Sequence, residues 1–338
     1  MRNAFTLVFA AFMTAASCPE IEAAPNLTKV VIAHASMNAR TAILWIAQER
    51  GFFAKNGIEA DLILMSRGPV LIASLTAGDV HFGYAGGTAA LGAAAGGVEV
   101  KIVATFTSRF MNNLVVRPGI HNANDLRGKL YGVSSLGGTL WMGAMLWLEH
   151  LGLDPRRDNV RFLVIGDQTL LSQALEKGVI DVTALDSAFS RKMKHKGFSV
   201  LGDFSQVNLP IMSSGLVVKK DYVYENPATL EKVLKALLES QAFILAARNK
   251  PIVIDTLMKR LRISDPSLAE EGYQDMMAGF DHKPYPSLEG LSNIQRLAKT
   301  RDPRVAKVRV EDLTDSRFLR RLDQSGFIDQ AYSYYGGK

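Results

Sequence analysis

The fold is decided by the stretch KVVIAHASMNARTAILWIAQERGFFAKNGIEADLILM, residues 29–65. A β-rich apolar run is followed by a helical pattern from Thr41 to Arg50, and after Gly51 a second apolar run extends from Ile58 to Met65. A strand, a helix and another strand in this order form the repeating unit of α/β proteins. The stretch therefore predicts an α/β fold.

The same alternation continues to about residue 218. Further strands are expected at 80–84, 100–105, 113–116, 130–134, 160–165, 180–185 and 217–218, and further helices at 69–76, 89–97, 140–151 and 169–177. Beyond Asn226-Pro227, Leu230, Val233 and Leu234 begin a helical stripe, which predicts a helical C-terminal third. Two α/β units imply a cleft, and ligands of open α/β sheets bind at the carboxyl ends of the strands.

Composition excludes several classes of protein. At roughly 150 residues per domain, a chain of 338 residues favours two domains. Its 48% hydrophobic and 21% charged residues exclude a disordered chain or a collagen. The net charge of +6 is spread along the chain without a basic run, which argues against a nucleic-acid binder. A single cysteine excludes a disulfide framework and cysteine-based metal sites.

The first 23 residues have the pattern of a secretory signal peptide. Arg2 precedes an apolar stretch from Ala4 to Ala16, and small residues lead to a cleavage site after Ala23. This apolar core is too short to remain as a membrane-spanning helix. We therefore expect export to the periplasm. The alternative is a lipoprotein that is acylated at Cys18.

Five motifs resemble those of a family of ABC-transporter substrate-binding proteins, the nitrate/sulfonate/taurine and thiamine-pyrimidine-precursor group (NMT1/THI5-like). In chain order they are GFFAKNGI at 51–58, LTAGDVHFG at 75–83, DLRGK at 125–129, ALEKGVID at 174–181 and EDLTDSRF at 311–318. His81 stands where the family usually has aspartate. The motifs occur in order across nearly the whole chain that follows the signal peptide.

The resemblance implies a periplasmic-binding-protein fold of type II, with two α/β lobes, a two-crossover hinge and a helical C-terminal extension. The first lobe is expected to comprise residues 27–112 plus 214–338, and the second lobe residues 113–213. Strands near 114–116 and 215–218 are expected to cross between the lobes and to act as hinges.

Three strand-to-helix loops carry candidate ligand-binding residues. Backbone N–H groups and hydroxyls at the start of a helix can bind an anion or a polar head group. In each loop the alternative is an ordinary helix cap or close packing of a helix on the sheet. The candidates are Asn38 in the first loop, Gly86, Gly87 and Thr88 in the second, and Ser135, Gly138 and Thr139 in the third.

Charged side chains near strand ends leave the charge of the ligand open. Arg67 and Arg109, the latter with its neighbour Ser108, could hold a carboxylate, sulfonate or phosphate, or could be solvated surface charges. Asp186 could hold an amine or a ring N–H, or could cap a helix. Four aromatic residues could stack on a flat ring or belong to the core, namely Phe106, Phe110, Trp141 and Phe189.

The sequence contains no catalytic or nucleotide-binding motif, and its histidines lack metal-binding spacing. We therefore expect no cofactor and no enzymatic activity. The predicted function is that of an exported, monomeric receptor that delivers a small organic ligand to an ABC permease and its ATPase. An organic anion such as a sulfonate, a carboxylate or an aromatic acid is preferred. Alternatives are a pyrimidine or thiamine precursor as ligand, an enzyme resembling those of the menaquinone pathway, and a sensor domain.

Overall fold

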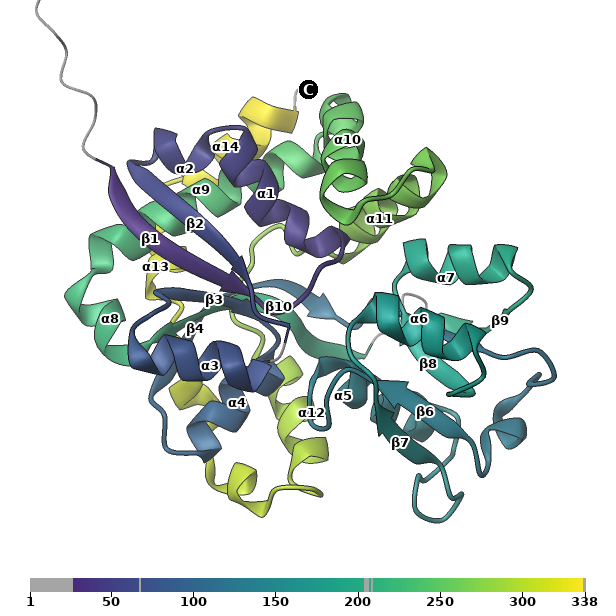
Figure 1. Ribbon diagram of the computed structural model, residues 1–338. Coiled ribbons are helices and arrows are strands. Elements are labelled where there is room, and N and C mark those ends of the chain that lie inside the picture. Colours follow the sequence, from purple (N-terminus) through teal and green to yellow (C-terminus); the bar gives the residue numbers. More distant parts are fainter. Residues whose placement is uncertain (1–26, 67, 204–206, 208, 337–338) are drawn as a thin grey trace, which may run out of the picture.

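Two mixed β-sheets, each flanked by helices, form the protein (Figure 1). The computed structural model describes residues 27–66, 68–203, 207 and 209–336. The predicted signal peptide, including Cys18, and Arg67 lie outside the described residues. Within the described part of the chain, every helix is too short or too polar to span a bilayer.

The first sheet has the strand order β2-β1-β3-β10-β4. Its strands are β1 (Thr28–His34), β2 (Ile58–Leu64), β3 (Phe82–Ala85), β4 (Val100–Arg109) and β10 (Pro210–Lys219). β1 runs parallel to β2 and β3, whereas β10 runs antiparallel to β3 and β4. We call this sheet and the helices packed on it the first lobe.

The second sheet has the order β7-β6-β8-β5-β9. Its strands are β5 (Asn113–Val116), β6 (Leu130–Val133), β7 (Arg161–Val164), β8 (Val182–Leu185) and β9 (Ser199–Asp203). β6 runs parallel to β7 and β8, and β5 runs antiparallel to β8 and β9. This sheet with its helices is the second lobe.

The chain crosses from the first sheet to the second between Arg109 and Asn113, and returns between Asp203 and Pro210. These two crossings and the two α/β sheets confirm the predicted fold class. One detail differs, because β5 lies wholly in the second sheet and β10 wholly in the first. The segments before these strands, rather than the strands themselves, pass between the lobes.

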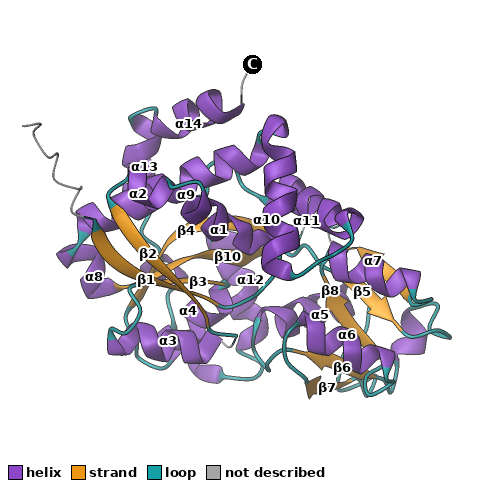
Figure 2. Cartoon of the chain, turned by 45° about the horizontal axis from the view of Figure 1, so that its top comes forward, coloured by secondary structure: helices purple, strands orange, loops and turns teal. Residues whose placement is uncertain are grey.

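Helices cover both faces of the first sheet (Figure 2). One face carries α1 (Ala42–Glu49), α2 (Phe52–Lys55) and α9 (Pro227–Leu245), and the other carries α3 (Gly68–Ala77), α4 (Gly87–Ala95) and α12 (Leu288–Ala298). The remaining C-terminal helices are α8 (Lys220–Glu225), α10 (Lys250–Leu261), α11 (Pro266–Gly279), α13 (Arg317–Gln324) and α14 (Phe327–Gly336). The helical C-terminal extension is therefore confirmed.

The second lobe contains α5 (Thr139–His150), α6 (Gln168–Glu176) and α7 (Ser187–His195). Neither α7 nor β9 was expected from the sequence. The α7 stretch SAFSRKMKH is mostly polar, and every residue of β9 is only partly buried at the edge of the sheet. Without a strong apolar period, neither segment gives a clear signal.

The GFFAKNGI motif attaches the C-terminal helices to the first lobe. Gly51 and Gly57 adopt φ values of 71° and 72°, a left-handed conformation that favours glycine, and so place a short helix between two turns. Within this helix, the ring of Phe52 packs edge-on against Phe243 of α9 and Tyr335 of α14. Burying a phenylalanine contributes roughly 1.5–3 kcal/mol, so this short motif joins distant parts of the chain.

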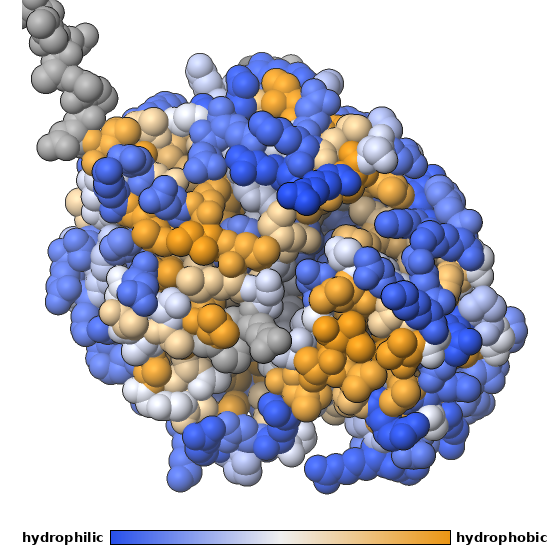
Figure 3. Space-filling model, in the orientation of Figure 1, coloured by the Kyte–Doolittle hydropathy of each residue, from blue (hydrophilic) through white to orange (hydrophobic). Residues whose placement is uncertain are grey.

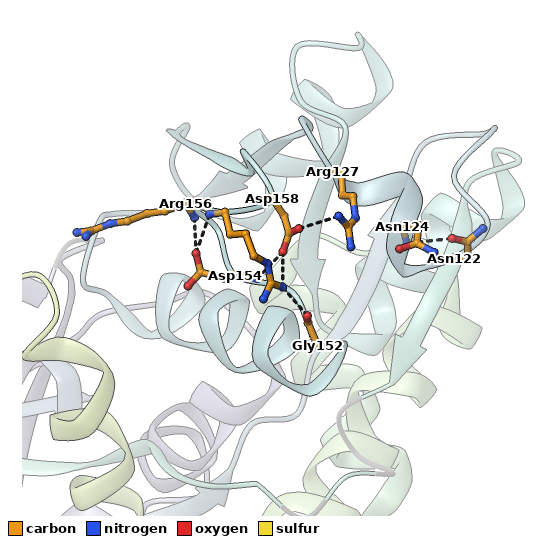
Figure 4. Close-up of polar contacts among 8 residues, drawn as sticks. Asn122, Asn124, Arg127, Gly152, Asp154, Arg156 and Asp158 are labelled. Atoms are coloured by element: carbon orange, nitrogen blue, oxygen red, sulfur yellow. Dashed lines mark hydrogen bonds and ion pairs between the residues drawn. The ribbon is translucent and has the colours of Figure 1, made fainter.

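Two other family motifs stabilise local structure. His81, in place of the usual aspartate, accepts a hydrogen bond at Nδ1 from the backbone N–H of Val31 at 2.9 Å. Burial lowers the pKa of His81, which keeps that nitrogen able to accept. In the second lobe, Arg127 of DLRGK and Arg157 both contact the buried carboxylate of Asp158, at 3.1 and 2.8 Å (Figure 4).

Candidate functional site

A cavity of about 460 Å³ lies between the two lobes. Figure 3 shows a hollow flanked by apolar surface on both sides. Its walls come from the loops after β1, β3 and β6, the starts of α4, α5 and α6, the first crossing segment and β10. These are the carboxyl ends of parallel strands, where a ligand site is expected in an α/β protein. We call this space the interlobe cavity.

Six of the residues predicted from the sequence line the interlobe cavity. They come from three different loops and from both lobes, and are Asn38, Gly86, Thr88, Ser135, Gly138 and Thr139. Trp141, one of the aromatic candidates, lines it as well. The structure thus brings together the three loops selected for their glycine and hydroxyl residues.

Other predicted residues lie outside the cavity lining. Gly87 packs so tightly that an added Cβ would come within 2.8 Å of Leu291 in α12. Ser108 donates through N and Oγ to Asp281, at 2.7 and 3.0 Å. The guanidinium of the partly buried Arg109 donates to the carbonyl of Ala278. Their contact with a ligand stays a prediction, as does that of Asp186.

Two aromatic candidates belong to the core. Phe106 and Phe110 are buried, and Phe106 packs near the ring of Tyr84. Phe189 is partly buried against the core of the second lobe. Of the four rings, only that of Trp141 borders the interlobe cavity.

The starts of α4 and α5 meet across the cavity. A Cβ on Gly86 would lie 2.4 Å from Oγ1 of Thr139, and the hydroxyls of Thr88 and Thr139 are 3.3 Å apart. The residues before the two helices are glycines, so no side chain caps either N-terminus. Two helix N-termini that face one space create a positive potential, which favours an anionic group.

Arg40 is the charged residue at the base of this site, and the sequence analysis did not select it. Its side chain lines the cavity although the residue is only 6% exposed. Nη1 donates to the carbonyl of Met111 in the first crossing at 3.4 Å, and within the described part of the chain Arg40 forms no ion pair. Arg40 lies in the selected loop with Asn38, but sequence alone does not separate a buried arginine from a solvated one.

Two buried amides beside Arg40 have incomplete hydrogen bonding. Asn38 and Asn112 are 7% and 2% exposed, and both line the cavity. Among the described residues, Oδ1 of Asn38 and Nδ2 of Asn112 have no hydrogen-bond partner. Burying such groups without partners is unfavourable, and a bound solute would supply them. We call Asn38, Arg40 and Asn112 the polar end of the cavity.

A pair of buried carboxylates joins the lobes behind Arg40. Asp275 of α11 accepts hydrogen bonds from N and Oγ of Ser187, at 3.1 and 2.5 Å, across the lobe boundary. Burial and the charge of nearby Asp186 raise the pKa of Asp275 to about 6, although Arg40 opposes the shift. Burial also raises the pKa of Asp186, which caps α7 by accepting from the N–H of Phe189.

Further contacts connect the lobes on the opposite side of the cavity. Arg296 of α12 holds the carboxylate of Glu149 of α5 at 3.0 and 3.1 Å. Arg301 donates to the carbonyl of Leu136 in the loop before α5 at 3.2 Å. Contacts on both sides hold the lobes together around the cavity. Among the described residues, no group of three acidic, histidine or cysteine side chains is placed to hold a metal ion.

A family profile and a curated relative both identify this chain as similar to binding proteins. The profile of the NMT1/THI5-like family matches residues 38–250. A candidate binding protein of Brucella abortus (strain 2308) is 28% identical over 238 residues, which cover 68% of this chain and 71% of the relative.

Solved structures show the same fold. The alkanesulfonate-binding protein SsuA of Xanthomonas axonopodis pv. citri, bound to MOPS, aligns with a TM-score of 0.70 at 16% identity, over 85% of this chain and 98% of that one. The periplasmic nitrate-binding protein NrtA of Synechocystis PCC 6803 aligns with a TM-score of 0.72 at 16% identity, over 89% and 90%. The fold expected from the five motifs is therefore confirmed.

Proposed function

Since the chain belongs to the NMT1/THI5-like family, we propose that it is an exported receptor for a small organic anion, which it delivers to an ABC permease and its ATPase. The observation that carries this proposal is the buried guanidinium of Arg40, which lines a cavity between two lobes without an ion pair to any described residue. A sulfonate, a carboxylate or an aromatic acid would pair with this guanidinium at contact distance, which the nearby Asp186 and Asp275 do not do.

The electrostatics of the cavity favour an anion over a neutral pyrimidine. Arg40 and Nδ2 of Asn112 offer donors, and the uncapped starts of α4 and α5 add the positive ends of two helix dipoles. A guanidinium can hold a carboxylate or sulfonate through two parallel hydrogen bonds. These features support the anion among the ligands that the sequence left open.

Ligand binding would act on the arrangement of the lobes. A solute that touches Arg40 in the first lobe and Ser135 in the second stabilises the closed form, because it makes both contacts only when the lobes are together. We place the lobes at residues 27–112 plus 214–338 and 113–213, with the two crossing segments as hinges. The proposal also includes a monomeric state and export directed by residues 1–23 as a signal peptide.

The test is a calorimetric titration of Arg40→Met with sulfonates, carboxylates, aromatic acids and pyrimidines, preceded by a thermal-shift screen of the unsubstituted protein. Methionine keeps an apolar stem of similar length but removes the charge. Hydrogen bonds to charged groups contribute about 1.5–3 kcal/mol, so we expect affinity for the anion to fall by about 10- to 150-fold.

Arg156→Met is the matched control, because Arg156 is an exposed arginine outside the cavity lining. It should bind as the unsubstituted protein does. Equal affinity of Arg40→Met and the control, or binding of pyrimidines alone, would contradict the proposal.

A further inference from the structure

A second cavity, of about 650 Å³, lies on the first lobe and shares no residue with the polar end of the interlobe cavity. It lies between the end of α4, the start of β4 and two short 3-10 helices, Pro303–Lys307 and Val310–Leu313. Five basic side chains line it, namely Lys101, Lys220, Arg304, Lys307 and Arg309. We call these five residues the basic patch.

Much of this charge comes from one segment of the chain. Residues 299–309 contain five basic residues and a single acidic one, Asp302. No two of the basic residues are adjacent, so the positive charge of the chain is less evenly spread than the absence of a basic run indicated. In Figure 1 this segment follows α12 along the lower edge of the first lobe, and Figure 3 shows mostly hydrophilic surface there.

The segment is anchored by its apolar residues. Val305, Val310 and Leu313 are 3–5% exposed, and the side-chain amide of Gln295 in α12 donates to the carbonyls of Val305 and Val308 at 2.9 and 2.5 Å. The side chains of Arg304 and Arg309, in contrast, are 70% and 76% exposed. The backbone is therefore held in place while the basic groups are directed outward.

The basic patch is only partly neutralised by its surroundings. Lys220 pairs with Glu99 at 2.7 Å, and Arg304 pairs with Asp302 at 2.8 Å. Arg309 reaches Asp312 only at 3.6 Å, and such exposed pairs are weak.

The two remaining lysines of the patch have no carboxylate at ion-pair distance among the described residues. Lys101 donates to the backbone carbonyl of Asp312, which leaves its charge unopposed by a carboxylate. Lys307 is exposed and forms no ion pair within the described ranges. Both ammonium groups are therefore available to an external anion.

Helix α7 of the second lobe carries a comparable set of basic residues that is neutralised. Four of the six residues from 191 to 196 are lysine or arginine. Arg191 pairs with Glu271 of α11, and Lys196 pairs with Glu176 of α6. Asp265, at the start of α11, adds a further negative charge near Arg191. Sequence charge alone therefore does not distinguish the two regions, but their acidic neighbours do.

We infer that the basic patch binds the phosphate groups of an anionic membrane surface. Basic clusters bind such surfaces because each exposed cation meets a lipid phosphate and adds to the attraction. Among the described residues, no exposed large apolar side chain lines this cavity, so the patch lacks the apolar centre of a typical protein–protein interface.

The position of the patch gives membrane binding a consequence. Arg301, Asp302 and Val305, from the same segment, line the interlobe cavity. Binding through the patch would therefore hold the rim of that cavity near the membrane, where a permease lies. The inference goes beyond the proposed function and does not depend on which solute the cavity takes.

The first test is co-sedimentation with vesicles. The chain from Ala24 onward is used, so that the predicted signal peptide cannot itself insert. It should bind vesicles of phosphatidylglycerol and phosphatidylcholine, release them at about 0.5 M salt, and leave pure phosphatidylcholine vesicles unbound. Equal binding to both kinds of vesicle would overturn the inference. So would release by pyrophosphate at the same concentration of phosphate as the lipid presents, because the patch would then bind free phosphate.

The second test is the double variant Lys307→Gln/Arg309→Gln. Each cation at an anionic surface changes binding by about fivefold, so the variant should bind the anionic vesicles about 30-fold more weakly. Neither residue lines the interlobe cavity, so affinity for the anion found in the thermal-shift screen should stay the same. Failure of vesicle binding with intact anion binding would therefore overturn this inference alone, and the opposite result would overturn the proposed function alone.

Lys192→Gln/Lys194→Gln is the matched control, because it removes the same charge from exposed positions of α7. It should bind the vesicles as the unsubstituted protein does. An equal loss in both double variants would mean that net charge alone causes the attraction and would overturn the inference. Binding of polyglutamate without binding of anionic vesicles would assign the patch to an acidic protein partner and would overturn it too.

Discussion

The polar end of the cavity and the arginine–aspartate cluster of the second lobe use similar residues in opposite ways. In the cluster, Asp158 is buried and accepts from Arg157 at 2.8 Å and from the backbone N–H of Asp154 at 2.7 Å (Figure 4). At the polar end, Arg40 is buried without a described ion pair, and Asn112 has an unpartnered donor. A buried charge with ion-pair partners at contact distance belongs to a structural cluster, whereas a buried charge that lines a cavity without such a partner is available to a solute.

A substitution that keeps the lobes apart should cause the largest loss of ligand affinity. Gly86→Val places a side chain where a Cβ already lies 2.4 Å from Oγ1 of Thr139 and 3.1 Å from the carbonyl oxygen of Ser213. The backbone at Gly86 is extended, so valine causes no backbone strain there. Overpacking costs about 1–3 kcal/mol, which predicts a loss of affinity of about 5- to 150-fold.

Calorimetry measures this loss, and small-angle scattering checks its cause. The radius of gyration should shrink on ligand addition in the unsubstituted protein but not in Gly86→Val. A variant that binds normally would show that the lobes need not approach each other at this point.

Truncating one side chain in each region separates an effect on ligand binding from an effect on stability. Asn112→Ala removes one neutral hydrogen bond to the solute and should weaken binding by about 2- to 10-fold. It should not lower the melting temperature, because the substitution removes a buried amide nitrogen that has no hydrogen-bond partner among the described residues. Asp158→Ala should do the reverse, with a lower melting temperature and unchanged affinity. If both variants behaved alike, the two regions would not differ in their roles as binding site and structural cluster.

The carboxylate pair between the lobes predicts a pH dependence. Burial and the nearby charge of Asp186 raise the pKa of Asp275 to about 6, and opening would expose Asp275, separate the two carboxylates and return that pKa toward 3.8. A raised pKa means that the closed form binds the proton more tightly, so closure is favoured as pH falls below about 6 and loses this contribution as pH rises through 6.

Ligand binding near pH 6 should therefore be accompanied by proton uptake, which calorimetry in buffers of different ionisation enthalpy measures directly. Asp275→Asn should abolish the uptake while keeping an oxygen that accepts from Ser187. Uptake that persists in this variant would assign the proton to another group.

The ion pair between Arg296 and Glu149 should have the smallest effect. Both side chains are about half exposed, and exposed pairs contribute about 0–1 kcal/mol. Glu149→Gln should change affinity by less than about fivefold at low salt, and by less at 0.5 M salt, as titrations at both concentrations would show. A large effect at high salt would mean that this contact controls closure.

The fold was largely predictable because its signals are local. Gly51 and Gly57 mark turns that need a left-handed backbone, and the stripe beginning at Leu230 matches the buried face of α9. The segments that were missed, α7 and β9, lack an apolar period and are positioned by contacts with the rest of the lobe.

The site was predictable only in part. Gly86, Gly138 and Thr139 belong to strand-to-helix loops, whose chemistry is visible in the sequence. Arg40 and Asn112 were missed because their burial depends on the crossing segments and on the opposite lobe. Ser108 and Arg109 contact residues that follow them by about 170 positions, in α11 and the turn after it, and no local pattern reveals such partners.

The most direct test of the central claim is the distance between the lobes with and without the organic anion that the thermal-shift screen identifies. The chain has one cysteine, Cys18, within the predicted signal peptide, so spin labels can be placed uniquely in the mature protein. Val70 and Val164 are suitable positions, because they are 51% and 48% exposed on opposite lobes. The account predicts that the ligand shortens this distance and that the shortening is lost in Arg40→Met; identical distances with and without the bound ligand would contradict it.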